Sequence, residues 1–326
     1  MEILDLRHFR SRDLERLLAE EKALWQKDLA WDYSASAAMI KRYLDSASLP
    51  GYAAVEGGRP IGFGFYVQEN YKGVVGDVFA TEGPGAAQAE IELLTHSIQT
   101  LQATPGIRRI EAQLMTLRHP PSSDFFAQHG LQSFRRQFMA LPLDQAPSLS
   151  PSSDGVRVAV WDPRWKEEAA RLIARAYRGH IDSSISDQYR SHEGALRFLD
   201  NIIRYPGCGE FDPDCSFLAF HKDSNGAALR GMALSSTVGE GVSHITQVCV
   251  GPESQGTGLG RLLIGKIIQR LRERKARAAT LTVTTGNHTA IRLYRQFNFS
   301  ILKEFDALAW DAPEEESNSW VLGRRS

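Results

Sequence analysis

Cysteine is scarce in this chain of 326 residues, which contains only Cys208, Cys215 and Cys249. A small and odd number of cysteines does not make a disulfide framework. The spacing of Cys208 and Cys215 is not that of a usual zinc site, and no nearby pair of cysteines or histidines completes a set of four ligands. We therefore expect no metal ion in this protein.

Long apolar runs and an excess of charge of either sign are also missing. No stretch of about 18 or more apolar residues occurs, so no transmembrane helix is expected. The N-terminus carries charges where a secretory signal needs an apolar core. The 38 Lys and Arg residues nearly balance the 39 Asp and Glu residues, for a net charge of −1, which gives no reason to expect nucleic-acid binding. We expect a cytoplasmic protein that binds neither nucleic acid nor a membrane.

The order of the predicted elements indicates two domains of similar size. Each half opens with a strand and a helix, and each closes with a short helix followed by a strand. The segment 125–131 resembles the segment 293–299, at an offset of 168 residues. The sequence therefore predicts two copies of one α+β module. The predicted boundaries are a first module at 1–143, a Pro- and Ser-rich linker at 144–155, a second module at 156–311 and a polar tail at 312–326.

The most informative stretch runs from Val248 to Arg261 and reads VCVGPESQGTGLGR. A β-branched run ends there at a glycine-proline pair, and an amphipathic helix starts at Leu259. The turn between them points backbone N–H groups at one spot, where the helix dipole also favours an anion. Glycine at every second position lets a phosphate approach the backbone. The pattern predicts a site for a phosphorylated ligand.

Two motifs in the second half occur in a fixed order. The first is Gln255–Gly260, with the pattern Gln-x-x-Gly-x-Gly, and the second is Asn287–Tyr294, followed by Phe297 and Phe299. With these motifs, residues 156–311 resemble the GNAT superfamily of N-acetyltransferases, whereas residues 1–143 match it by element order only. Asn298 stands where the family commonly has glycine, and asparagine also tolerates a left-handed helix cap. The tandem order is similar to that of two-module acetyltransferases of the mycothiol synthase type.

The resemblance implies an α+β fold, in which each module is a mixed, mostly antiparallel sheet flanked by helices. It implies acetyl-CoA as cosubstrate, with its pantetheine arm between two strands that splay apart, 245–250 and 280–284. The loop amides would hold the pyrophosphate. The implied cofactor-binding residues are Val248, Cys249, Val250, Gln255, Gly256, Thr257, Gly258, Leu259, Gly260, Arg261 and Asn287.

Acetyl transfer to an amine needs a proton acceptor for the ammonium and a proton donor for the leaving thiolate. Tyr294 is the expected donor, because a phenol stays protonated at neutral pH; the alternative is a packed aromatic side chain. His244 is the expected base, with Glu240 and Asp214 as further candidates; the alternative for His244 is a histidine at the end of a strand. Asn287 is expected to cap its helix as well as to bind the cofactor.

The acceptor is predicted to be a small-molecule amine or a peptide N-terminus. The segments 177–189 and 205–214 are expected to surround it. Their acidic residues Asp182, Asp187 and Glu210 suit a cationic acceptor.

The first half lacks the features that mark the second. Phe126 stands at the position of Tyr294, His119 at that of Asn287, and Pro84 interrupts the segment where a glycine loop would be. We expect this half to bind no acetyl-CoA and to be catalytically silent. Two rival functions are a sensor that binds acyl-CoA without turnover and a nucleotide-binding module of another kind. The second rival lacks the Gly-Lys-Ser/Thr ending of a P-loop.

Overall fold

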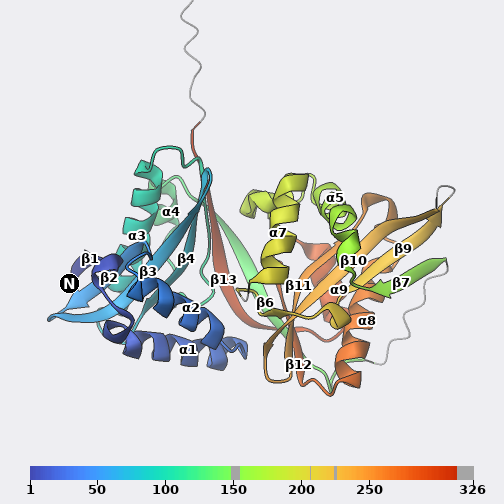
Figure 1. Ribbon diagram of the computed structural model, residues 1–326, viewed down its shortest axis with the longest axis horizontal. Coiled ribbons are helices and arrows are strands. Elements are labelled where there is room, and N and C mark those ends of the chain that lie inside the picture. The colour runs from blue at the N-terminus through green and yellow to red at the C-terminus, as the bar shows by residue number, and fades with distance from the viewer. Residues whose placement is uncertain (148–154, 206, 224–225, 314–326) are drawn as a thin grey trace, which may run out of the picture.

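The computed structural model describes residues 1–147, 155–205, 207–223 and 226–313 (Figure 1). The middle of the predicted linker and most of the predicted tail lie outside these residues. The elements of the first half, in chain order, are β1 (Glu2–Asp5), α1 (Glu15–Leu29), α2 (Ser34–Asp45), β2 (Gly51–Glu56), β3 (Arg59–Glu69), β4 (Lys72–Ala80), α3 (Ala86–Ala103), β5 (Arg109–Gln113), α4 (Ser123–Gln128) and β6 (Gln132–Pro142).

The second half repeats this order. Its elements are β7 (Val156–Val160), α5 (Lys166–Ala176), α6 (Asp182–Ile185), the 3-10 helix η4 (Asp187–Tyr189), α7 (His192–Arg204), β8 (Glu210–Phe211), β9 (Phe217–Asp223), β10 (Gly226–Gly239), β11 (Val242–Val250), α8 (Leu259–Glu273), β12 (Ala278–Thr284), α9 (His288–Gln296) and β13 (Ser300–Asp311). Strands and helices mix in both halves, and the strands form a mixed, mostly antiparallel sheet. The predicted fold class is confirmed.

The strands of both halves join in one sheet. Their order is β1-β2-β3-β4-β5-β13-β6-β12-β11-β10-β9-β7, and β8 pairs with β10 off this path. The two halves lie side by side with β13 and β6 between them (Figure 1). The pairs β4–β5 and β11–β12 are parallel, and the other pairs are antiparallel.

The last strand of each half is exchanged with the other half. β6 belongs to the first half in sequence, yet it pairs with β12 along residues 136–142. β13 belongs to the second half, yet it pairs with β5 along residues 307–311. Each of the ranges 1–143 and 156–311 therefore has its sheet completed by a strand from the other range. Their division into two domains stays a prediction.

Both exchanged strands start earlier than the sequence predicts, which placed them at 138–143 and 307–310. β6 begins at Gln132 and β13 at Ser300, and the first residues of both are mostly exposed. Because the two strands are antiparallel, the first residues of each pair with later residues of the other across the centre of the sheet. Backbone hydrogen bonds therefore hold them without apolar side chains. Alternation of apolar residues, the sequence signal for a strand, is therefore absent there.

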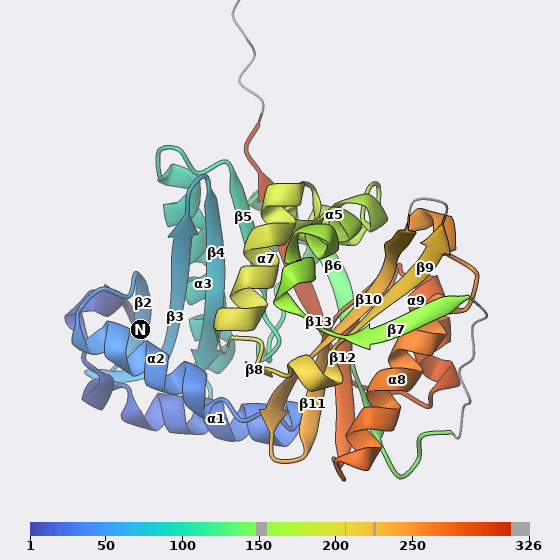
Figure 2. The same cartoon turned by 45° about the vertical axis from the view of Figure 1, so that its right-hand side comes forward.

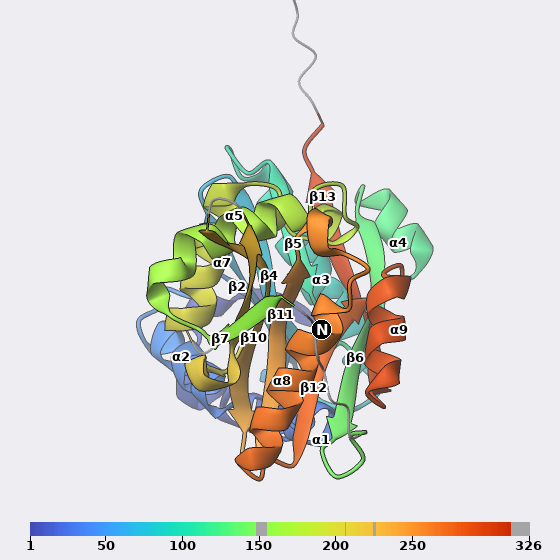
Figure 3. The same cartoon turned by 90° about the vertical axis from the view of Figure 1, so that its right-hand side faces the viewer.

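Helices cover both faces of the sheet. In the second half, α5 and α7 pack on one face and α8 and α9 on the other (Figures 2 and 3). In the first half, α1 and α2 pack on one face and α3 on the other. The cluster under α1 and α2 crosses between the halves, because it joins Trp31 and Phe138 with Val238 and Val242. The two halves thus share part of one core.

None of the helices in the described residues is both long and apolar enough to cross a membrane. The longest, α3, carries Glu90 and Glu92 within its length. The cytoplasmic location of the protein stays a prediction.

Candidate active site

A cavity of about 660 Å³ lies where β11 and β12 separate. The two strands pair only from Val242 with Ala278 to Ile245 with Leu281. β11 continues to Val250 without a partner on this side, which confirms the predicted splaying of the strands. The walls of the cavity come from β11, the loop before α8, the first turn of α8, α9, the segment after α5 and the strand β6.

The glycine loop forms one wall of the cavity. Gly256 and Gly258 have φ angles of 78° and 85°, a left-handed conformation that glycine adopts without strain. Gly258 is the N-cap of α8, and the N–H groups of the following first turn have no acceptor within the helix. These N–H groups and the positive end of the helix dipole suit a phosphate group.

The start and the middle of α9 form a second wall. The side chain of Asn287 caps this helix by accepting the N–H of Ala290 at 3.1 Å. Tyr294 lies two turns further on, is 8% exposed and lines the cavity. Burial raises the pKa of Tyr294, so its phenol is neutral at physiological pH. Within the described part of the chain, its hydroxyl has no hydrogen-bond partner.

Two stacked tyrosines form the wall on the α5 side. The rings of Tyr177 and Tyr189 are 4.3 Å apart and nearly parallel. The amide of Gln247 on β11 holds both hydroxyls, since its Nε2 donates to Tyr177 Oη at 2.9 Å and its Oε1 accepts from Tyr189 Oη at 3.2 Å. Burial raises the pKa of both tyrosines, which makes them neutral polar groups rather than bases.

His180 and Asp182 complete this wall. His180 Nδ1 is 3.6 Å from Asp182 Oδ2 and also accepts the backbone N–H of Asp182 at 3.2 Å. Thr284 Oγ1 donates to Asp182 Oδ1, which ties this carboxylate to the end of β12. The Asp182 side chain is 14% exposed, and both residues line the cavity. A proton acceptor and an anion thus face the same space as the Tyr294 hydroxyl.

The sequence of the second half matches a known family and known relatives. Residues 172–299 match the acetyltransferase (GNAT) family. A mycothiol acetyltransferase of Thermobifida fusca is 29% identical over 212 residues, which cover 60% of this chain and 62% of that protein. One of Nocardiopsis dassonvillei is 26% identical over 289 residues, covering 80% and 82%. The chain thus spans about three fifths of the length of the first of these relatives.

Solved structures share the fold across both halves. A GCN5-related N-acetyltransferase from Sphaerobacter thermophilus superimposes with a TM-score of 0.63 at 19% identity, covering 95% of this chain and 96% of that one. A tandem GNAT protein from the clavulanic acid biosynthesis pathway has a TM-score of 0.56 at 17% identity, covering 97% and 99%. Residues 172–299 are thus similar in sequence to GNAT acetyltransferases, and both halves share the fold of tandem GNAT structures.

The cavity fits acetyl-CoA, the cosubstrate that the similarity to GNAT acetyltransferases implies. The unpaired edge of β11 from 246 to 250 offers backbone groups to the two amides of the pantetheine arm. The first turn of α8 offers N–H groups to the pyrophosphate, and Arg261 and Arg292 line the same cavity. Nearly all the predicted cofactor residues line it: Val248, Cys249, Val250, Gln255, Gly256, Gly258, Leu259, Gly260, Arg261 and Asn287.

Two of the predicted cofactor residues, Thr257 and Cys249, do not offer their side chains to the cavity. Thr257 does not line the cavity, and its hydroxyl donates to the carbonyl of Ser254 at 2.7 Å within the loop. Cys249 turns its side chain into the core under α5 and α7, where burial raises the pKa of the thiol to about 12. Only the backbone of Cys249 is therefore available to a ligand.

His244, the predicted base, lies outside this cavity, which corrects the sequence-based interpretation. Its ring packs between Trp31 and Phe138, with centroids 5.0 and 5.5 Å away, and its Nδ1 is 2.9 Å from Thr280 Oγ1. Burial lowers the pKa of His244 to about 3, so the ring is neutral at physiological pH. The further candidates Glu240 and Asp214 also lie outside the cavity lining.

The two segments that were predicted to surround the acceptor line two different hollows of the structure. The segment 177–189 lines the cavity, but Tyr205, Glu210 and their neighbours line a separate hollow of about 520 Å³ beside Asp32. Asp187 is buried against Lys72, with 2.6 Å between Oδ1 and Nζ. Of the three predicted acidic residues, only Asp182 therefore faces the acceptor side.

Several residues of the site were not predicted. Gln247 was detectable, because a long polar side chain within an apolar strand is a signal for function. His180 lay in a predicted acceptor segment without a role of its own. Arg136 had no signal, since it comes to the cavity only through the pairing of β6 with β12.

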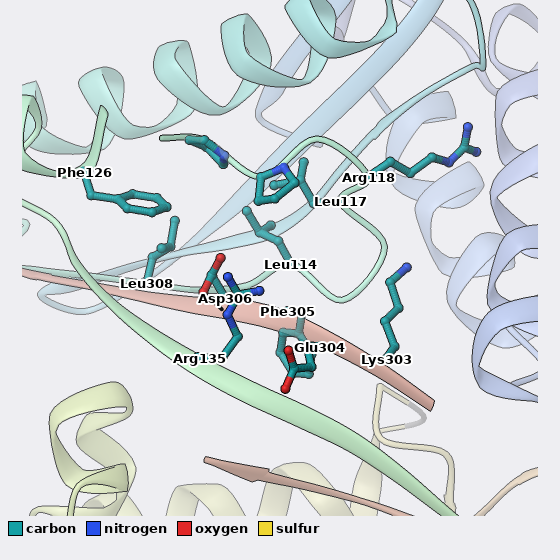
Figure 4. Close-up of a pocket in the computed structure, with 12 residues that line it drawn as sticks. Leu114, Leu117, Arg118, Phe126, Arg135, Lys303, Glu304, Phe305, Asp306 and Leu308 are labelled. Carbon is teal, nitrogen blue, oxygen red and sulfur yellow. Dashed lines mark ion pairs between the residues drawn. The ribbon is translucent and has the colours of Figure 1, made fainter. Parts of the chain in front are cut away.

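The first half has a smaller hollow at the corresponding place, of about 380 Å³ (Figure 4). Phe126 lines it where Tyr294 lines the larger cavity, and Arg135 forms an ion pair with Asp306 at 3.3 Å. Figure 4 shows Phe126 at one end and Lys303 at the other. No hydroxyl equivalent to that of Tyr294 is present at the Phe126 position.

The gap between β4 and β5 is also bridged by side chains. The two strands pair only as far as Val75 with Ala112. Just beyond, Asp77 on β4 accepts a hydrogen bond from Thr116 Oγ1 at 3.1 Å and another from Tyr33 Oη at 3.0 Å. The counterpart of the pantetheine channel is thus crossed by a buried carboxylate and its donors.

Proposed function

We propose that this protein is an N-acetyltransferase that moves an acetyl group from acetyl-CoA to a small-molecule amine in the cavity of its second half. The observation that carries the proposal is the free hydroxyl of the buried Tyr294, which lines the same cavity as the glycine loop. The relatives reported above are mycothiol acetyltransferases, which supports a small acceptor molecule. A peptide N-terminus is the alternative acceptor.

The residues of the cavity supply the two proton transfers that the reaction needs. Acetyl-CoA supplies the acetyl group as a thioester, and the C–N bond forms as the C–S bond breaks. Tyr294 Oη donates its proton to the leaving sulfur, and the second proton that the nitrogen loses on becoming an amide restores the phenol. His180 takes the proton of the acceptor ammonium, because an imidazole exchanges protons near neutral pH. Asp182, 3.6 Å away, stabilises the imidazolium that forms.

The first half is proposed to be catalytically silent. It has Phe126 in place of the donor, and its strand gap is crossed by Asp77 and Thr116. Its role in this proposal is structural: it provides β6 beside β12 and the core around Trp31.

The test is release of free thiol from acetyl-CoA by the purified full chain across a panel of small amines. We expect turnover with at least one amine, and we expect Tyr294→Phe to lower kcat about 100-fold, since general acid catalysis contributes a factor of this order. Tyr205→Phe is the matched control, because Tyr205 is 60% exposed and lies outside the cavity. Its kcat should equal that of the wild type.

Two results would count against the proposal. If acetyl-CoA binds but no amine or peptide is acetylated, the chain is a sensor of acyl-CoA rather than an enzyme. If turnover occurs and Tyr294→Phe matches the wild type, Tyr294 is not the proton donor.

A further inference from the structure

Arg136 reaches the active-site cavity from the first half of the chain. It stands on β6, where it pairs with Thr284 of β12 in an antiparallel register. Residues directly opposite in such a pair project to the same face of the sheet. Because the Thr284 hydroxyl bonds Asp182, Arg136 lies on the same face as Asp182. It lines the cavity together with Tyr189 and Tyr294.

The guanidinium of Arg136 has N–H donors that no acceptor among the described residues uses. An arginine carries five N–H donors. Of these, Nη1 donates to Oε1 of Gln113, and Nε is buried without an acceptor. Among the described residues, no carboxylate forms an ion pair with Arg136. A buried donor on a charged group is costly unless an anion or another acceptor meets it.

The charges of the cavity are arranged on two sides. Arg261 and Arg292 stand on α8 and α9, on the face opposite α5 and α7. On the α5 side, Arg136 is the cation and Asp182 the anion. Burial raises the pKa of Tyr294, Asp182 raises it further and Arg136 opposes this shift, which places both charges near the proton donor.

The strands on either side of Arg136 supply no anion for it. Its partners in the sheet are Thr284 on β12 and Phe305 on β13. Glu304, next to Phe305, pairs with Gln137 and accepts a hydrogen bond from Gln137 Nε2 at 2.9 Å. Because neighbouring residues of a strand project to opposite faces, the Glu304 carboxylate lies on the face of the sheet away from Arg136.

We propose that Arg136 binds an anionic group, a carboxylate or a phosphate, on the acceptor molecule. The acceptor then carries both an amine, placed at His180 and Asp182, and an anion, placed at Arg136. This inference rests on the proposed acetyl transfer and narrows its substrate class from amines to zwitterionic small molecules. A guanidinium suits both anions, because it can donate two parallel hydrogen bonds.

The test compares matched acceptors that differ only in the anion. Phenylalanine against phenethylamine tests the carboxylate, and phosphoethanolamine against ethanolamine and glucosamine 6-phosphate against glucosamine test the phosphate. We expect the wild type to prefer the anionic member of at least one pair by tenfold or more in kcat/KM. Arg136→Gln should lose that preference, with a fall of about 10–100-fold for the anionic member alone.

Three controls separate the binding of the anion from general damage. Arg136→Lys should keep part of the preference, because it keeps the charge. Arg135→Gln, on the neighbouring exposed residue, should match the wild type, and the acetyl-CoA affinity of Arg136→Gln should be unchanged. Equal loss on both members of each pair, or no preference in the wild type, would overturn the inference.

A binding experiment distinguishes failure of the anion site from failure of the proposed acetyl transfer. If no amine is acetylated, binding of the same acceptor pairs can be measured by calorimetry with CoA present. Tighter binding of the anionic member to the wild type than to Arg136→Gln would then support the anion site without turnover. Equal binding to both proteins would reject it.

Discussion

At the scale of single residues, His180 and His244 differ in their surroundings. His180 lines the cavity beside Asp182, whereas His244 is enclosed by Trp31 and Phe138. Burial lowers the pKa of His244 from 6.5 to about 3, so this ring does not change its charge over the pH range in which an enzyme works. A histidine next to a strand motif is therefore not enough to identify a base.

The activities of two variants distinguish the two histidines. We expect His180→Phe to lower kcat/KM about 100-fold, because it removes the proton acceptor from the cavity. His244→Phe keeps an aromatic ring between Trp31 and Phe138 and should keep kcat/KM close to that of the wild type. The measurement is kcat/KM at neutral pH for both variants. A loss of this size in His244→Phe alone would restore His244 as the base.

The same pKa shift predicts how His244 affects stability. Its folded pKa lies below the ordinary value, so its contribution is present above pH 6.5 and is lost as the pH falls towards 3. His244→Phe should therefore lose less stability than the wild type over this acidic range in urea unfolding. Parallel curves for the two proteins would show that His244 titrates normally.

At the scale of elements, the β11–loop–α8 unit was predictable because its signals are local. An apolar strand, alternate glycines and an amphipathic helix follow one another within a few residues, and the structure has them in that order. Asn298 likewise takes the predicted left-handed conformation, with φ of 68°. In contrast, the early starts of β6 and β13 depend on pairing between distant segments, which leaves no pattern in the sequence.

Gly258 allows a direct test of the loop. A Cβ atom at Gly258 would meet no protein atom within 4 Å, so it would project into the space of the ligand. We expect Gly258→Ala to weaken acetyl-CoA binding tenfold or more, by calorimetry, and to cost about 1–2 kcal/mol of stability for its left-handed backbone.

The matched control for this variant is Gly58→Ala. Gly58 has φ of 76°, similar open space and a place in the hairpin between β2 and β3. It should cost a similar amount of stability with no change in acetyl-CoA affinity. Equal affinities for both variants would remove the loop from the binding site.

At the scale of the whole molecule, a buried ionic network joins the first half to the acceptor side of the second. Lys72 and Glu111 lie on β4 and β5, and Asp187 begins η4, which carries Tyr189. Lys72 Nζ is 2.6 Å from Asp187 Oδ1, and the backbone N–H of Asp187 donates to Glu111 Oε1 at 2.7 Å. Burial opposes the ionisation of Asp187, but Lys72, Tyr71 and Arg109 hold its pKa below the ordinary value.

Removal of Lys72 should therefore damage both stability and the site. Lys72→Met leaves the buried carboxylate of Asp187 without its ion-pair partner, whereas Glu111 keeps Arg109 at 2.5 Å. We expect a loss of about 3–5 kcal/mol in the free energy of unfolding. Its kcat/KM should fall as well, because η4 carries Tyr189. Lys41→Met is the control: it breaks the exposed pair with Glu15 and should cost less than about 1 kcal/mol. Equal losses would show that the network does not join the halves.

Neither this network nor the exchange of β6 and β13 could be predicted from the sequence. Repetition at an offset of 168 residues correctly indicated two similar modules. It could not show that each module is completed by the other's last strand, because both strands have the same apolar pattern and either could pair with either sheet. Arg136 was missed for this reason, although it lies only two residues from the predicted strand.

The central claim is that one acetyl-CoA site exists per chain, in the gap between β11 and β12. Calorimetric titration of the purified full chain with acetyl-CoA tests it most directly. The account predicts one bound molecule per chain in the wild type and binding at least tenfold weaker in Gly258→Ala. Two equal sites per chain, or one site that Gly258→Ala leaves intact, would contradict it.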